Sequence, residues 1–137
     1  MKKKIGIDID DTLTNLHEIF LSYGFDFINR WNINIKNINL YGYEAIDTFN
    51  FTAKENNKFK KEYLEKMLMQ AHPRPLAKEV INELSTEYYI YIITSRDKKL
   101  IKNCKNKTID WLKSNDIFYN KLIFNCKDKV EFCKKNN

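Results

Sequence analysis

The 137-residue sequence has little glycine and proline, three and two residues respectively, which excludes collagen-like and low-complexity chains. Its three cysteines are an odd number at spacings that match neither a zinc site nor a redox motif, which argues against a disulfide framework. No apolar run is long enough to span a bilayer, and Asp8 interrupts the first such run too early for a signal peptide. We therefore expect a cytoplasmic protein with reduced thiols and no membrane partner.

Hydrophobic residues make up 43% of the chain, which suits one folded domain with a modest core rather than a disordered tail. The formal net charge is +6. However, the lysines are spread along the chain among acidic residues, whereas a nucleic-acid interface needs a clustered basic stripe. We expect no nucleic acid polymer as a partner, and a basic surface that helps to attract small phosphorylated anions.

The most informative stretch runs from Lys3 to Asn15, where a short apolar run meets three acids. The β-branched residues predict a buried strand over Ile5–Ile9, and Asp8, Asp10 and Asp11 fall where that strand ends. Crowded carboxylates repel each other, so a cation or basic side chains should compensate them. The plain alternative is a solvated acidic turn.

An EF-hand calcium loop is a second alternative for these acids, and the sequence excludes it. A loop starting at Asp8 would need Gly at position 13 and Glu at position 19, where the chain has Leu13 and Ile19.

The rest of the chain alternates between helical and strand patterns. Apolar residues recur at helical spacing over 16–31, 54–70, 76–84, 107–114 and 127–135, and short apolar runs predict further strands over 88–93 and 122–124. Residues 32–51 are rich in Asn and aromatics without a clear period and indicate loops and short turns. The unbroken run 88–93 is typical of a strand buried on both faces. This order predicts an α/β fold with right-handed βαβ units.

Polar side chains follow each predicted strand. In an open α/β sheet, ligands bind beyond the carboxyl ends of the strands, so we expect the acid cluster, Thr94–Arg96, and Lys127 or Lys129 to lie at one edge. Carboxylates, hydroxyls, an Arg and a Lys at one edge suit metal-assisted phosphoryl transfer. Alternatively, Thr94 and Ser95 cap the next helix and Arg96 is a surface charge.

The strand followed by Asp8-x-Asp10-x-Thr12-Leu13 resembles the first motif of the haloacid dehalogenase superfamily of phosphohydrolases. Thr94, which ends a hydrophobic strand, resembles its second motif, and Lys129, which begins a later helix, resembles its third. Asp11 stands where the family most often has Gly.

Within the superfamily, the chain is most similar to the 5'(3')-deoxyribonucleotidase (type C nucleotidase) branch and its bacterial relatives. The similarity rests on Thr94-Ser95-Arg96, on Lys107-Thr108 with Trp111, and on the stretch Ala71 to Leu76.

This resemblance implies a Rossmann-like parallel sheet, formed by residues 1–14 and 75–137, with a small inserted helical cap over residues 15–74. It implies a magnesium-dependent phosphatase that acts on (deoxy)nucleoside monophosphates through an aspartyl-phosphate. Asp8 would be the nucleophile, Asp10 the general acid/base, and both would bind magnesium. The catalytic set implied is Asp8, Asp10, Thr94 and Lys129, and the phosphate-binding set adds Ser95 and Arg96.

Relatives also carry a fourth motif, an acidic pair at the end of a further strand, which this sequence does not show. That strand would pair with the first one, so we expect either a fragment or shortened enzyme, or a chain that has lost part of its catalytic apparatus and can form a homo-oligomer through the open edge. The alternative function is a catalytically impaired phosphate-binding or protein-interaction module. Asp97, Asp116 and Asp128 are the other acids that could complete the metal site.

Overall fold

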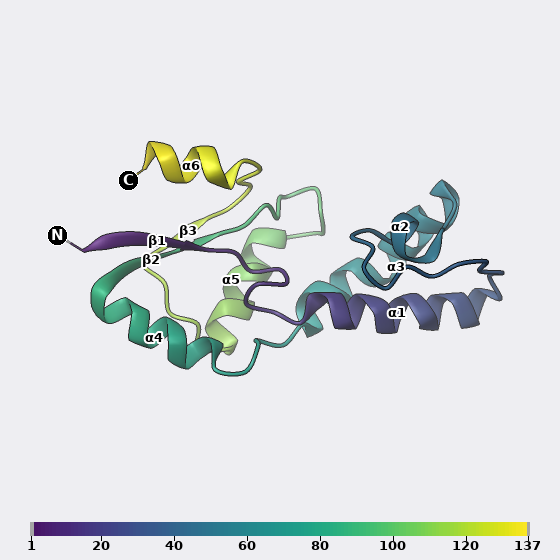
Figure 1. The fold of residues 1–137 in the computed structure, drawn as a ribbon, viewed down its shortest axis with the longest axis horizontal. Helices are drawn as coiled ribbons and strands as arrows, with labels where there is room; N and C mark the ends of the chain where they lie inside the picture. The colour runs from purple at the N-terminus through teal and green to yellow at the C-terminus, as the bar shows by residue number, and fades with distance from the viewer. Residues whose placement is uncertain (1, 137) are drawn as a thin grey trace. The chain divides into compact units, whose positions relative to one another are not determined.

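The computed structural model describes residues 2–136, which form two compact units. The core unit contains the chain through Asn15 and from His72 onward, and the inserted unit is Leu16–Ala71 (Figure 1). The sequence placed the corresponding junctions after residues 14 and 74. In the described part of the chain, no helix combines the length and apolar character needed to cross a bilayer.

The core unit is built on a three-stranded parallel sheet with the order β1-β2-β3. The strands are β1 (Lys3–Ile7), β2 (Tyr88–Ile93) and β3 (Lys121–Ile123). Ile5 pairs with Ile90 and Ile92 pairs with Leu122. The unbroken apolar run 88–93 therefore forms the central strand, which pairs with β1 on one side and with β3 on the other. The predicted α/β fold with a parallel sheet is confirmed.

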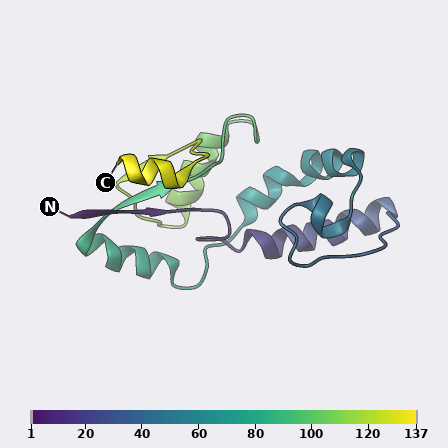
Figure 2. The same ribbon diagram turned by 45° about the horizontal axis from the view of Figure 1, so that its top comes forward.

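Helices α4 (Ala77–Glu87) and α5 (Cys104–Ser114) pack on one face of this sheet, whereas α6 (Lys129–Lys135) lies on the other (Figures 1 and 2). Side chains alternate along a strand, so Ile5 and Ile7 of β1 point toward α4 and α5. The buried residues of this core are Ile9, Leu13, Ile81, Ile90, Ile92, Trp111, Leu112 and Ile117.

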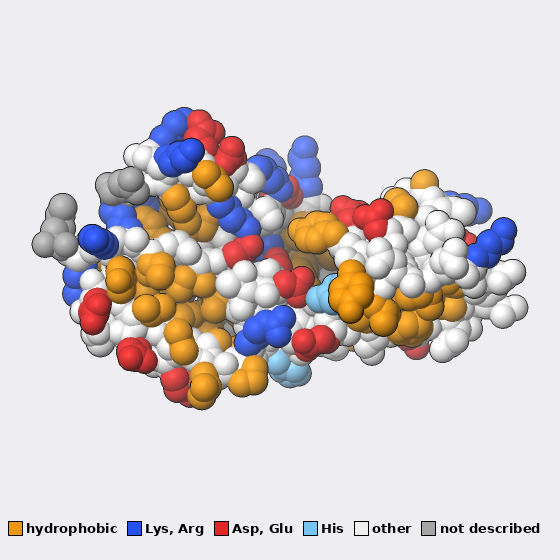
Figure 3. Space-filling model, viewed as in Figure 1, with side chains coloured by type: hydrophobic (Ala, Val, Ile, Leu, Met, Phe, Trp, Pro, Cys, Tyr) orange, Lys and Arg blue, Asp and Glu red, His pale blue; other side chains and the backbone are white. Residues whose placement is uncertain are grey.

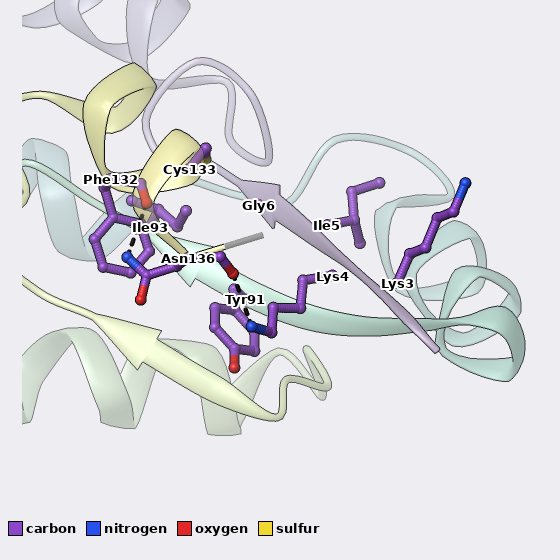
Figure 4. A pocket seen from close by; sticks show the side chains of 9 residues that line it. All are labelled: Lys3, Lys4, Ile5, Gly6, Tyr91, Ile93, Phe132, Cys133 and Asn136. Carbon is purple, nitrogen blue, oxygen red and sulfur yellow. Dashed lines mark hydrogen bonds between the residues drawn. The ribbon is translucent and has the colours of Figure 1, made fainter. Parts of the chain in front are cut away.

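The face under α6 is covered more thinly, since no residue of α6 is buried. A cavity of about 330 Å³ lies between α6 and the sheet, lined in part by Tyr91, Ile93, Phe132 and Cys133 (Figure 4). A Cβ added at Gly6 would lie 2.5 Å from Ile93 Cδ1, so the end of that side chain would have to shift. Within residues 2–136, β1 has a neighbouring strand on one side only.

The inserted unit consists of α1 (Leu16–Trp31), α2 (Ala45–Phe49) and α3 (Ala53–Gln70). A reciprocal capping box between Thr52 and Glu55 begins α3. Aromatic rings form most of the core of this unit, namely Phe27, Phe49, Phe51, Phe59 and Tyr63.

Several predicted bounds differ from the structure: β1 covers Lys3–Ile7 rather than Ile5–Ile9, and α4 ends at Glu87 rather than at residue 84. The stretch 32–51 was expected to be loops and turns, but α2 forms within it, because a helix of five residues is too short to show a periodic pattern. Helix α5 begins at Cys104 rather than at residue 107. Helix α6 begins at Lys129 rather than at residue 127, because the Asp128 side chain caps it by accepting from the Glu131 N–H.

The two ends of the inserted segment leave the core unit side by side. The Asn15 N–H donates to the His72 carbonyl at 3.1 Å, and the His72 N–H donates to the Asn15 side chain at 2.8 Å. Thr14 and Pro73 add an isolated antiparallel bridge. The core unit is therefore continuous in space although it is interrupted in sequence.

Candidate active site

Asp8 is the first residue after β1, and a tight loop follows it. The Ile9 carbonyl accepts from the Leu13 and Thr14 N–H groups at 2.9 and 3.2 Å. Asp11 has a φ of 57°, in the left-handed region that favours glycine and tolerates Asp. This backbone explains why an acid can occupy a position where glycine would be expected, and it holds Asp8 and Asp10 at the carboxyl end of the strand.

Lys129 lies at the first position of α6 and donates to a carboxylate oxygen of Asp8. Both side chains are partly buried, with exposed fractions of 34% and 29%. The ion pair compensates the charge of Asp8 with a lysine from the far end of the chain. The structure thus brings together the residues that resemble the first and third motifs.

Lys127 was the competing lysine, and the structure places it elsewhere. Its ammonium donates to the Ser95 carbonyl at 2.7 Å and to the Asp97 carboxylate at 2.9 Å. The hydrogen bond from Lys127 holds the pKa of Asp97 below its ordinary value. Lys127 therefore ties the loop after β3 to the loop after β2, while Lys129 faces Asp8.

Asp10 is held by Arg96, which follows β2. Arg96 Nε and Nη2 donate to the two carboxylate oxygens of Asp10 at 2.9 and 2.5 Å, a bidentate fork. Arg96 is 1% exposed, although it was expected as a phosphate ligand. Its guanidinium is engaged below the surface with Asp10 rather than open to solvent.

Thr94 ends β2 and is buried. Its hydroxyl oxygen accepts from the Arg96 N–H at 3.2 Å, which leaves the hydroxyl proton for another acceptor. Its main-chain carbonyl accepts from the Cys126 N–H at 2.9 Å, so the loops after β2 and β3 are joined. Ser95 is exposed beside it. The predicted residues after all three strands thus lie along one edge of the sheet.

A metal site at this edge would have few protein ligands. Among the residues that the structure describes, no three His, Cys, Asp or Glu side chains form a group that could hold an ion. The other acids considered are engaged elsewhere: Asp97 with Lys127, Asp116 with Lys78, and Asp128 as the cap of α6. Magnesium is typically bound by one or two carboxylates together with waters and substrate phosphates, so the oxygens of Asp8 and Asp10 fit it.

Sequence reasoning missed the residue that supports Arg96. Thr108 on α5 is fully buried, and its hydroxyl accepts from Arg96 Nη1 at 3.3 Å. The sequence drew attention to Lys107-Thr108 only as part of a family resemblance. A buried Thr near the start of a helix gives no signal of its own, because such residues are common in helix cores.

On the face shown in Figure 3, Lys and Arg side chains are spread among Asp and Glu rather than gathered in one stripe.

Comparison with known proteins supports the fold. No family model matches the chain, and no curated protein matches it. Among solved structures, a haloacid dehalogenase-like hydrolase from Streptococcus pneumoniae is similar over 90% of this chain and 61% of its own, with a TM-score of 0.61 and 15% identity.

Two further hydrolases are similar at comparable levels. One, from Xanthomonas campestris, is a haloacid dehalogenase-like family hydrolase that matches over 98% of this chain and 67% of its own, with a TM-score of 0.59 and 15% identity. The other, from Bacillus subtilis and bound to magnesium, matches over 90% and 65%, with a TM-score of 0.52 and 16% identity. The chain therefore spans about two thirds or less of these proteins, and its fold is that of haloacid dehalogenase-like hydrolases.

Proposed function

We propose that this chain is a magnesium-dependent phosphohydrolase that cleaves phosphomonoesters through an aspartyl-phosphate. The observation that carries the proposal is the pairing at the edge of the sheet, where Asp8 meets Lys129 and Asp10 meets Arg96. Two neighbouring carboxylates, each with its own cation and each partly exposed, match the nucleophile and proton carrier that phosphoryl transfer needs.

In the proposed reaction, a carboxylate oxygen of Asp8 attacks phosphorus, and the bond between phosphorus and the ester oxygen breaks. Asp10 donates a proton to that leaving oxygen. A water then attacks the aspartyl-phosphate, Asp10 takes a proton from this water, and the bond between Asp8 and phosphorus breaks to release phosphate. Positioned proton transfer of this kind typically contributes ~10²–10⁴-fold.

Thr94 and Lys129 hold the phosphate oxygens in this proposal. The Thr94 hydroxyl proton is available for a phosphate oxygen, because its oxygen serves as the acceptor for Arg96. The ammonium of Lys129 next to Asp8 is close to where negative charge develops during attack.

Magnesium would be held by the Asp8 carboxylate and the Asp10 main-chain carbonyl, with the substrate phosphate and waters as further ligands. Once bound, the ion supplies positive charge to the phosphate oxygens. The magnesium bound to the similar Bacillus subtilis hydrolase supports this choice of metal.

A nucleoside monophosphate is the proposed substrate, in line with the nucleotidase resemblance.

The test is phosphate release from a panel of nucleoside monophosphates and a small generic ester, with magnesium and with a chelator. We expect magnesium-dependent release that Asp8→Asn abolishes while the circular dichroism spectrum is unchanged. Faster release from nucleoside monophosphates than from the generic ester would support the proposed substrate class, and equal rates would contradict it.

A silent phosphate-binding or protein-interaction module is the second candidate. The observation that favours it is that Lys129 engages Asp8 directly while the described residues offer no three-ligand metal cluster. Under this alternative, the chain binds phosphate or a protein partner but releases no phosphate from any ester, with or without magnesium.

A further inference from the structure

Arg96 is the largest of the fully buried side chains, and its charge must be compensated inside the core unit. Its guanidinium donates through three nitrogens: Nε and Nη2 to Asp10, and Nη1 to Thr108. Asp10 and Arg96 are 86 positions apart in sequence. The pair therefore joins the loop after β1 to the loop after β2.

Thr108 fixes the other side of the guanidinium. Its hydroxyl donates to the Cys104 carbonyl at 2.8 Å, one turn earlier on α5. Because the only hydroxyl proton is used there, the oxygen can serve Arg96 solely as an acceptor. Arg96 therefore donates to Thr108, and Thr108 in turn donates to the helix backbone.

Arg96 is also fixed at its own backbone. Its N–H donates to the Thr94 hydroxyl, and its carbonyl accepts from the Asn125 N–H at 2.9 Å. A side chain held at both ends and buried cannot swing out to a substrate without breaking these bonds. This argues against Arg96 as a direct phosphate ligand.

We infer that Arg96, held in place by Thr108, is a positioning residue that orients the Asp10 carboxylate to accept a proton from the attacking water. This inference rests on the proposed function, because Asp10 needs a fixed orientation only if it transfers a proton. A rigid fork fixes both oxygens of the carboxylate, whereas a single hydrogen bond would let the group rotate. The alternative is an ion pair that merely stabilises the core unit.

Thr108→Val tests the inference, because it replaces the hydroxyl by a methyl group of similar size and removes the acceptor for Arg96; urea unfolding checks that the variant is folded. We expect kcat to fall by up to ~10²-fold, the loss that a misplacement of about 1 Å causes, and KM to stay unchanged. Thr108→Ser keeps the acceptor and should retain the wild-type kcat. Thr86→Val is the matched control, since the Thr86 hydroxyl also donates to a helix carbonyl, that of Glu83, but lies on exposed α4 surface.

Substitution of Arg96 itself tests the same inference directly. Arg96→Lys keeps the charge but loses the fork, so kcat should fall further than in Thr108→Val. A raised KM at unchanged kcat would overturn the inference and make Arg96 a phosphate ligand. An unchanged kcat in folded Thr108→Val, or an equal loss in Thr86→Val, would leave the ion pair with a purely structural role and overturn it as well.

A spectroscopic measurement separates this inference from the proposed function. The chain has three arginines, so its side-chain Nε–H spectrum contains three signals. Arg96 should give the slowly exchanging one, since Arg30 and Arg74 are exposed, and Thr108→Val should shift it. Fast exchange at Arg96 would overturn the positioning inference while leaving phosphate release intact. A protected Arg96 in a chain that releases no phosphate would overturn the proposed function, and the positioning role with it.

Discussion

Lys129 and Asp8 are 121 positions apart in sequence, yet the lysine ammonium donates directly to the aspartate carboxylate. The contact joins the loop after β1 to the first residue of α6, an element that has no buried residue of its own. A short helix of this kind depends on its cap and its tertiary contacts. The pair therefore links the placement of α6 to the charge of the proposed nucleophile.

Lys129→Met should lower kcat by ~10²–10³-fold, the range that removal of one preorganised charge-stabilising donor costs. Lys127→Met is the matched control, because Lys127 contacts Asp97 and the Ser95 carbonyl instead of Asp8. Steady-state phosphate release by both variants is the measurement. A larger loss in Lys127→Met would mean that the two lysines were assigned the wrong way round, and equal losses would mean that both act only through the surface charge.

The register of the acid motif can be tested at Asp11. Its φ of 57° is strained for a residue with a Cβ, so Asp11→Gly should preserve activity and raise the free energy of unfolding slightly. Asp11→Ala should destabilise the chain by ~1 kcal/mol, because Ala lacks the local hydrogen bonding that lets Asp tolerate this region. Urea unfolding and phosphate release check both. If Asp11→Asn impaired turnover more than Asp10→Asn, the assignment of the proton carrier would be wrong.

Tyr63 in the inserted unit predicts a pH dependence of stability. Burial and the hydrogen bond to Asp26 at 2.7 Å raise its pKa, although Arg30 partly offsets this. The folded chain therefore keeps the phenol proton to a higher pH than the unfolded chain, whose tyrosines titrate near ~10. The stabilisation is complete below that pH and is lost as pH rises through the folded pKa. Urea unfolding between pH 8 and pH 11 should show this loss, and Tyr63→Phe should reduce it; an identical pH profile in that variant would contradict the assignment.

Among residues 2–136, β1 has a neighbouring strand on one side only, which predicts self-association at high concentration. Ile5 and Ile7 are partly buried, and the neighbouring sheet face carries the cavity under α6. Light scattering should show a molar mass that rises from monomer toward dimer with concentration. A concentration-independent monomer would contradict this prediction.

Local patterns were enough to predict the sheet. The isoleucines of β1 and the unbroken apolar run of β2 each predict a strand from local sequence. The helices predicted between the strands in turn indicated parallel pairing. The same logic placed Asp8, Thr94 and the C-terminal lysines at one edge. Position relative to a strand end is a local property, so a sequence can report it.

Partners across the site could not be predicted. Nothing in the sequence favours Arg96 over other basic residues as the partner of Asp10, because the choice depends on how the loops after β1 and β2 pack. The role of Thr108 could not be predicted for the same reason, since it depends on the guanidinium next to it. Lys127 and Lys129 differ by two positions, and only the cap at Asp128 decides which of them begins α6 and faces Asp8.

The covalent intermediate on Asp8 gives the most direct test of the proposed function. The chain is mixed with substrate and magnesium, quenched in acid within the first turnover and digested, and the peptide that contains Asp8 is analysed by mass spectrometry. We predict a phosphoryl group on Asp8 that is absent from Asp8→Asn and accumulates in Asp10→Asn, where activation of water is impaired. Phosphate release by the wild-type chain without phosphorylation of Asp8, or with the phosphoryl group on another residue, would contradict the account.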